Sequence, residues 1–318
     1  MLSSALWRPD IDPAHEPHRV LIKRDAFVDP ARGGRRVPFK IYYPEMDGDM
    51  PLVLWSHGLG GSADGASFLA RFIASHGYIV VNMQHVGTDS SLWEGKPGHP
   101  WDVIRATKIE RATVLNRFKD VPFVLDSLPA WLEQHKDIPA RPDYAHVGMS
   151  GHSFGALTTQ VMAGQMFPGE DGMLQSFREP RFRAGILYSP VPSRHLTDAD
   201  ESALYGPMTL PLLFMTGTAD ESPIEGFGPT ERMAVFEHAT GRDQSLLILE
   251  DGDHMVFAGS RGKLTGYPKI PLHETIIKTV ALAWWEAWLR DDKTARAWLT
   301  QGGVNSWLKG EAVLRGRA

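Results

Sequence analysis

Short apolar runs alternate with stretches of helical spacing along most of the chain. Short apolar runs are typical of strands that are buried on both faces of a sheet. The expected buried strands lie at residues 52–56, 78–82, 144–149, 183–188, 212–216 and 245–250. Helical spacing indicates helices at residues 66–75, 117–134, 154–165, 229–238 and 272–289. Because strands and helices alternate, right-handed crossovers should place these strands parallel in one largely buried central sheet flanked by helices.

The segments outside this alternation are less regular. Residues 19–25 and 37–43 flank a turn rich in glycine and are predicted to form an antiparallel pair. The other segments are predicted to form a surface arm (1–17), a loop region with a charged helical part (83–116), a small irregular lid (189–210) and a C-terminal extension with one short helix (292–318). Neither an internal repeat nor a linker divides the chain, so we expect a single domain over residues 1–318.

Composition narrows the class of protein. In 318 residues, 42% are hydrophobic and 22% are charged, which is typical of a globular domain with a sizeable core. The formal net charge of −5 argues against a nucleic-acid partner or a basic membrane patch. No apolar stretch approaches the roughly 18 residues of a membrane-spanning helix, and residues 1–12 do not resemble a signal peptide.

The chain contains no cysteine. Disulfide bonds, thiolate catalysis and thiolate metal sites are therefore excluded. A chain without disulfides fits a reducing compartment, so we expect a cytoplasmic location.

Residues 151–155 read Gly-His-Ser-Phe-Gly, a G-x-S-x-G pattern between an expected strand and an expected helix. A serine hydroxyl is a weak nucleophile until a base takes its proton, so it must stand free of the sheet and within reach of that base. A sharp strand-to-helix turn provides this position, and glycines on either side leave room for close backbone approach. The pattern predicts Ser153 as a nucleophile; the alternative is an ordinary turn.

A serine nucleophile needs a base and a carboxylate that orients it. His254 and Asp220 each follow an expected strand, at the sheet edge where active sites of parallel sheets form. We interpret His254 as the base and Asp220 as the acid. Glu225, Asp251 and Asp253 are the rival carboxylates, although the last two share a tight turn with His254.

Residues 57–61 read His-Gly-Leu-Gly-Gly and lie between an expected strand and an expected helix. Backbone N–H groups at such a place can stabilise an oxyanion. The expected donors are the amides of Leu59 and of Phe154, the residue after the nucleophile. The alternative is a glycine-rich turn without a ligand. His57 is interpreted as a structural residue beneath this loop.

Aromatic residues are candidates for a substrate pocket. We place Trp93, Trp101 and Tyr188 in its wall, with core or surface packing as the alternative for each. His85 and His99 show no metal-ligand spacing, and the glycines after His57 lack the dinucleotide-binding pattern. We therefore expect neither a metal nor another cofactor.

These motifs resemble those of the α/β-hydrolases, in the branch described as dienelactone-hydrolase-like and related to platelet-activating-factor acetylhydrolase. The resemblance covers residues 37–289 and is carried by residues 56–61, 117–126, 151–155 and 253–254. The chain is also similar to cutinase-like polyesterases. The resemblance implies an ester hydrolase of the α/β-hydrolase fold, with Ser153, Asp220 and His254 as its triad and the amides of Leu59 and Phe154 as its oxyanion hole.

The expected function is hydrolysis of small neutral or apolar esters through an acyl-enzyme, so the expected partner is a small-molecule ester. Two alternatives remain open. The same triad cleaves amides, so a peptidase or amidase is the first. A hydrolase-fold protein that binds a ligand without turnover is the second.

Overall fold

A large central sheet organises the protein. The computed structural model describes residues 5–259 and 269–317, and within them nine strands form one sheet in the order β1-β2-β4-β3-β5-β8-β9-β10-β11. In chain order these strands are β1 (Val20–Asp29), β2 (Arg35–Pro44), β3 (Gly48–Ser56), β4 (Ile79–Met83), β5 (Ala140–His152), β8 (Phe182–Tyr188), β9 (Leu212–Ala219), β10 (Gln244–Asp253) and β11 (Ala312–Gly316). A separate small hairpin joins β6 (Phe167–Pro168) to β7 (Leu174–Gln175).

The strands from β4 to β10 in this order pair in parallel, while the pairs β1–β2, β2–β4 and β10–β11 at the two sides of the sheet are antiparallel. The predicted parallel sheet and the predicted antiparallel pair of β1 and β2 are confirmed. The carboxyl ends of the parallel strands β3, β5, β9 and β10 lie at the same end of the sheet. The loops that carry the candidate residues therefore lie together at this end.

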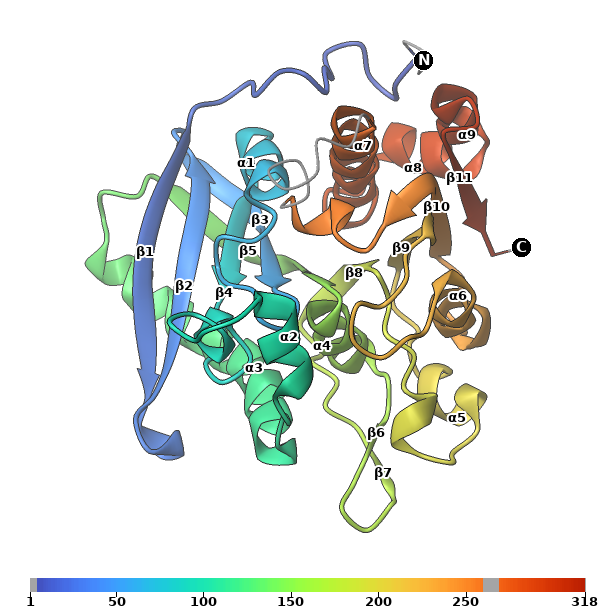
Figure 1. The fold of residues 1–318 in the computed structure, drawn as a ribbon. Helices are drawn as coiled ribbons and strands as arrows, with labels where there is room; N and C mark the ends of the chain where they lie inside the picture. The colour runs from blue at the N-terminus through green and yellow to red at the C-terminus, as the bar shows by residue number, and fades with distance from the viewer. Residues whose placement is uncertain (1–4, 260–268, 318) are drawn as a thin grey trace.

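Helices cover both faces of the sheet (Figure 1). In chain order they are α1 (Ser67–Ser75), α2 (Pro100–Ala106), α3 (Arg111–Gln134), α4 (Phe154–Ala163), α5 (Glu201–Tyr205), α6 (Pro229–His238), α7 (Ile270–Leu289), α8 (Lys293–Thr300) and α9 (Gly303–Leu308). Side chains alternate along β3: Val53 and Trp55 pack with α1 and α7, whereas Leu52 and Leu54 pack with α3 and α4. Both faces of the strand are buried, as the unbroken apolar run predicts. The protein thus has the α/β-hydrolase fold.

Helix α3 differs from the prediction. The sequence indicates a helix from residue 117 that is interrupted by Pro122 and Pro129, yet α3 runs from Arg111 to Gln134 with both prolines inside it. An internal proline removes one backbone hydrogen bond and disfavours a helix locally. The apolar face of α3, which includes Val121 and Leu125, is buried against the sheet. This tertiary packing outweighs the local cost.

The two ends of the chain pack together on the α7 face. The arm runs across the molecule from β1 toward α7 (Figure 1). It is anchored there, because Trp7 is buried with its ring 5.2 Å from that of Trp298, and Arg8 forms an ion pair with Glu286. The predicted short helix in the extension is α8, whereas α9 and the edge strand β11 escaped prediction.

The segment predicted to be a lid contains α5. Leu204 and Tyr205 of this helix are fully buried in a cluster that they share with α4 and α6. The Tyr205 hydroxyl accepts a hydrogen bond from the backbone N–H of Ser193. These contacts anchor the segment, and its role as a lid stays a prediction. Within residues 5–259 and 269–317, none of the helices combines the length and hydrophobicity that a bilayer crossing needs.

Candidate active site

Ser153 stands at the sharp turn between β5 and α4. Its backbone angles are φ 55° and ψ −118°, a strained conformation for a residue with a side chain. The flanking glycines explain how the turn fits. A Cβ on Gly155 would lie 1.8 Å from the carbonyl oxygen of Ser56, and one on Gly151 would lie 2.3 Å from the carbonyl oxygen of Gly155. The pattern thus folds as a nucleophile elbow.

Asp220 and His254 meet from neighbouring strand ends. His254 Nδ1 lies 2.9 Å from Asp220 Oδ1, and the Thr216 hydroxyl donates to Asp220 Oδ2 over 2.9 Å. A carboxylate only accepts, so Nδ1 carries the proton and Nε2 is left to accept one. Burial of Asp220 favours its neutral form. The hydrogen bond from His254 and the charge of Arg232 outweigh burial and hold the pKa of this carboxyl below its usual value.

The rival carboxylates have other partners. Asp251 forms an ion pair of 2.6 Å with Lys269. Asp253 accepts from the backbone N–H of Met255, and Glu225 accepts from the hydroxyl of Ser222. Asp220 is the carboxylate that binds the imidazole of His254.

The expected oxyanion donors lie beside the elbow. The loop of Leu59 follows β3, and Phe154 opens α4 directly after Ser153. Among the hydrogen bonds of the described residues, none uses the backbone N–H of Leu59 or Phe154. Both residues are half-buried, and two amides without a protein partner beside Ser153 are suited to bind a ligand oxygen.

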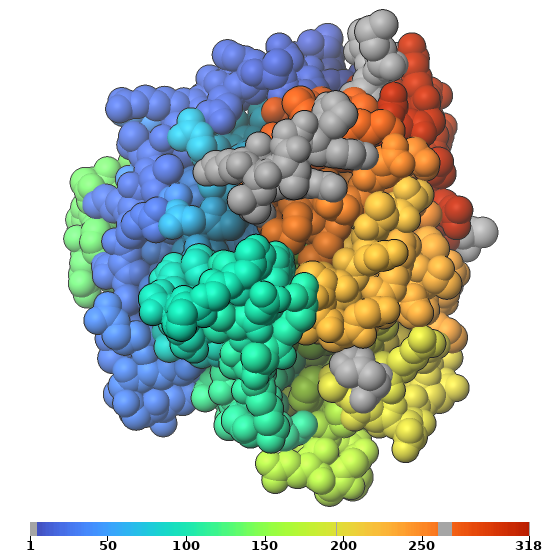
Figure 2. All heavy atoms as spheres, viewed as in Figure 1, coloured from blue at the N-terminus to red at the C-terminus, as the bar shows by residue number. Residues whose placement is uncertain are grey.

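A cavity of about 660 Å³ opens over this site. Ser153 and His254 both lie in its wall, although no hydrogen bond joins the Ser153 hydroxyl to the His254 ring within the described residues. Trp93 and Trp101 line the cavity, and their place in a substrate pocket stays a prediction. The sequence had not marked Trp55, which lines it as well. On the face drawn in Figure 2, the blue-green region of α2 meets the yellow to orange region that follows β9 and β10.

The prediction for Tyr188 is wrong. Its side chain is fully buried and does not line this cavity. The ring lies 5.3 Å from that of Trp55 and 5.8 Å from that of Phe257, between the sheet and its helices. Tyr188 is the last residue of β8, and the strand turns its side chain toward the core. The sequence does not show whether an aromatic side chain at the end of a strand points to the cavity or into the core.

Arg232 is a site residue that the sequence did not reveal. It is 1% exposed, and its Nε lies 3.0 Å from Asp220 Oδ1 and donates to the backbone carbonyl of Asp220 over 2.9 Å. Its Nη1 donates to the carbonyls of Ser189 and Pro190, and its Nη2 lies 3.0 Å from His254 Nδ1. Because that nitrogen already donates to Asp220, the guanidinium opposes a positive charge on the imidazole. Arg232 lies on a helix that carries both polar and apolar residues, and its place in the sequence does not indicate that it is buried.

His152 packs against the ring of His254. Its ring centroid lies 4.7 Å from that of His254, and its Nε2 lies 2.8 Å from the His254 carbonyl oxygen, to which it donates. Burial, followed by the neighbouring His254, lowers the pKa of His152 well below its usual range, so the ring is neutral. Within the part of the chain that the structure describes, no group of three or more histidine, aspartate or glutamate side chains is arranged to hold a metal.

Comparisons with known proteins find similarity to ester hydrolases. The family model described as platelet-activating factor acetylhydrolase, isoform II, matches residues 37–93, which include the Leu59 loop. A platelet-activating factor acetylhydrolase from Canis lupus familiaris is 25% identical over 252 residues, which are 68% of this chain and 50% of that protein. The chain therefore spans about half the length of this curated relative.

The fold is also similar to a solved structure, a ferulic acid esterase from Streptomyces cinnamoneus. The TM-score is 0.59 with 18% sequence identity, over 88% of this chain and 93% of that chain. At this identity the likeness concerns the fold, and it agrees with the predicted α/β-hydrolase architecture.

Proposed function

We propose that the protein is a serine ester hydrolase with Ser153, His254 and Asp220 as its triad. The observation that carries the proposal is the hydrogen bond from His254 to Asp220 beside a cavity that also exposes the strained Ser153. The two unpaired amides of Leu59 and Phe154 support it. The names of the similar proteins, an acetylhydrolase and a ferulic acid esterase, both describe ester hydrolases.

Each step of the reaction uses groups of this chain and water. Ser153 Oγ attacks the ester carbonyl while its proton passes to His254 Nε2, and Asp220 stabilises the imidazolium that forms. The Leu59 and Phe154 amides donate to the oxyanion. Collapse of the tetrahedral intermediate breaks the bond to the alcohol, which leaves with the proton from His254. Water then attacks the acyl-enzyme by the same proton path and releases the carboxylic acid and free Ser153.

Small neutral or apolar esters suit the cavity best. Tryptophans 55, 93 and 101 form part of its wall. The described wall also carries the carboxylates of Asp64, Glu94 and Glu225 but neither lysine nor arginine to hold an anion. A strong preference for dianionic phosphorylated esters would contradict this substrate class.

A panel of p-nitrophenyl esters and matching p-nitroanilides tests the function. An esterase turns over the esters at least about 10³-fold faster than the anilides, because the amide bond is the harder one to break. Comparable rates on the anilides indicate a peptidase or amidase. Binding without turnover of either series indicates a non-catalytic ligand-binding protein. A cytoplasmic location is also proposed, from the absence of cysteine, and fractionation of the source cells tests it.

A further inference from the structure

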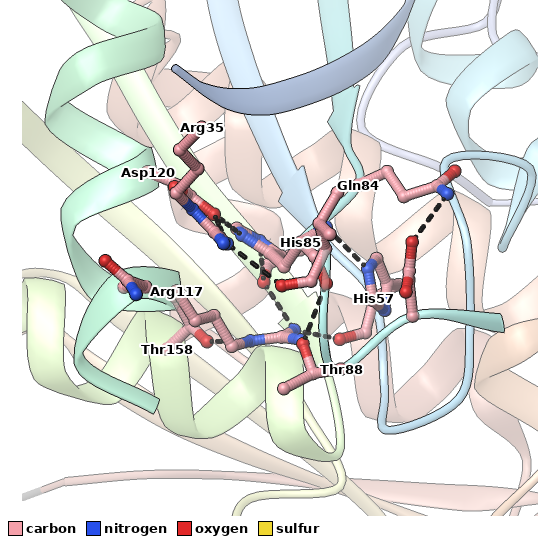
Figure 3. Close-up of polar contacts among 12 residues, drawn as sticks. Arg35, His57, Gln84, His85, Thr88, Arg117, Asp120 and Thr158 are labelled. Carbon is pink, nitrogen blue, oxygen red and sulfur yellow. Dashed lines mark hydrogen bonds and ion pairs between the residues drawn. The ribbon is translucent and has the colours of Figure 1, made fainter. Parts of the chain in front are cut away.

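A buried polar network lies directly beneath the Leu59 loop, and the reaction steps above do not use it. It joins the end of β3, the loop after β4, and helices α3 and α4 (Figure 3). Its centre is Arg117 of α3, whose side chain is fully buried.

Arg117 reaches four hydrogen-bond acceptors on three different parts of the fold. Its Nε donates to the Thr158 hydroxyl of α4 over 2.7 Å. Its Nη1 donates to the Thr88 hydroxyl over 2.8 Å. Its Nη2 donates to the Ser56 hydroxyl over 2.8 Å and to the backbone carbonyl of His57. Figure 3 shows the guanidinium between these groups.

These acceptors belong to the segments that carry the two oxyanion donors. His57 lies two residues before Leu59, and the carbonyl of Thr88 accepts from the Gly60 N–H over 2.9 Å. On the other side, Phe154 lies one turn of α4 before Thr158, and its ring centroid is 4.6 Å from the guanidinium carbon of Arg117. One side chain thus contacts both walls of the oxyanion hole.

Two histidines continue the network below the loop. His57 Nδ1 donates to the Gly58 carbonyl over 2.7 Å, and its Nε2 accepts from the His85 backbone N–H over 3.0 Å. Both ring nitrogens of His57 are occupied, which agrees with a structural role. His85 Nε2 accepts from the Ser56 hydroxyl, and its Nδ1 donates to Asp120, each over 3.0 Å.

Ionised Asp120 and two partly buried arginines end the network. Asp120 accepts from Arg35 over 2.7 and 2.8 Å and from Arg32 over 2.7 Å. Burial opposes its ionisation, but the hydrogen bonds from Arg35 and His85 outweigh burial and lower its pKa to about 2. Burial, aided by the charge of Arg117, lowers the pKa of His85 to about 4, so His85 is neutral at neutral pH.

The acceptors of Arg117 are hydroxyl and carbonyl groups rather than carboxylates. A buried charge without a directly bonded counter-ion is costly to folding. A buried arginine can hold several hydroxyl and carbonyl dipoles in one arrangement. Its planar guanidinium, with several N–H donors in fixed directions, suits this task better than the ammonium group of lysine.

We propose that Arg117 is a positioning residue that fixes the spacing of the Leu59 and Phe154 amides and so sets the strength of the oxyanion hole. This inference rests on the proposed ester hydrolysis. Arg117 acts through the loop after β3 and through α4, without contact with the substrate. Its loss should weaken binding of the tetrahedral transition state and leave binding of the ground-state ester nearly unchanged.

The test compares Arg117→Met, which keeps the length of the side chain but removes its donors, with Arg117→Lys, which keeps the charge and one donor group. We expect Arg117→Met to lose about 10²-fold in kcat with KM changed less than about threefold, because removal of one oxyanion donor has an effect of this size. The affinity for a trifluoromethyl ketone, which forms a tetrahedral adduct, should fall by the same factor. Arg117→Lys should recover part of both losses.

Arg290→Met is the matched control. Arg290 binds the Gly77 carbonyl and stacks over Tyr78 on the opposite face of the sheet, far in the fold from the elbow. The Arg290→Met variant should have a lower melting temperature but the same kcat and the same affinity for the ketone as the wild type. If Arg117→Met does not fold, Thr158→Val replaces it, since this change removes one acceptor of Arg117 and should show the same pattern at smaller size.

Three results would overturn the proposal. One is a folded Arg117→Met with wild-type kcat. Another is a fall in kcat together with a rise in KM by the same factor. The third is a crystal structure of Arg117→Met in which the Leu59 and Phe154 amides keep their wild-type spacing. Failure of the esterase assignment looks different, because the wild type itself would then hydrolyse none of the esters and bind no ketone, and the oxyanion role of Arg117 would fall with it.

Discussion

Replacing Arg232 with methionine should move the pH dependence of the reaction. A general base accepts a proton only in its neutral form, so a positive charge beside the base changes the pH at which kcat/KM rises from its low value in acid. Arg232 places a positive charge beside the ring of His254, with Nη2 3.0 Å from Nδ1. Its removal makes the imidazolium easier to form. The acid limb of kcat/KM should therefore shift to higher pH in Arg232→Met.

The size of this shift follows from the distance and the surroundings. Two unit charges about 4 Å apart interact by roughly 4 kcal/mol at an effective dielectric constant near 20, which sets an upper limit of about three pH units. His254 also borders the open cavity, and solvent that enters there screens the charge. We expect a shift of about one unit. The other titratable side chains in contact with His254, His152 and Asp220, are unchanged in the variant.

The assay is a pH profile of kcat/KM on a p-nitrophenyl ester for the wild type, Arg232→Met and Arg232→Lys. The lysine variant keeps the charge, so its acid limb should stay close to that of the wild type, even if kcat falls through loss of the carbonyl contacts. Circular dichroism and thermal unfolding confirm that each variant folds. An acid limb of Arg232→Met that coincides with the wild type would refute the electrostatic role and leave Arg232 a structural residue.

Three further predictions concern the triad acid, the elbow and the pocket. Asp220→Asn should lower kcat by about 10⁴ with the fold intact, and Asp253→Asn far less; a folded Asp220→Asn within tenfold of the wild type means that another carboxylate is the acid. Gly155→Ala should destabilise the protein by about 3 kcal/mol or more, because its Cβ would overlap a backbone carbonyl, whereas Gly228→Ala, which has room, should stay within about 1 kcal/mol in denaturant unfolding. Trp101→Ala should raise KM for bulky apolar esters several-fold with little change for acetate esters; equal changes in both would exclude Trp101 from the acyl pocket.

Much of the site could be predicted because its chemistry follows local patterns. In a parallel sheet, the residues just after each strand lie at the same end of the sheet. A serine, an acid and a histidine that each follow an apolar run can therefore be predicted to lie close together. The structure places Asp220 against His254 and both Ser153 and His254 on one cavity. The G-x-S-x-G spacing also anticipates the close approach at Gly155, where there is no space for a Cβ.

The remaining features depend on tertiary packing, which local patterns do not report. Arg117 and Arg232 lie on helices where an arginine normally faces water, and their burial results from which elements surround them. Pro129 stays inside α3 because packing against the sheet offsets the lost hydrogen bond. The edge strand β11 forms only because β10 offers a partner for it. Tyr188 points into the core for a similar reason, because its ring packs against the rings of Trp55 and Phe257.

Covalent labelling of the nucleophile tests the central claim most directly. A fluorophosphonate should add one adduct to the intact protein, and tandem mass spectrometry should place it on Ser153 rather than on Ser150. Ser150 lies three residues before Ser153 in the chain, is buried and donates to the Leu54 carbonyl. Ser153→Ala should take no label and lose ester turnover, while Ser150→Ala should keep both. A label on another residue, or full ester turnover by folded Ser153→Ala, would contradict the assignment of Ser153 as the nucleophile.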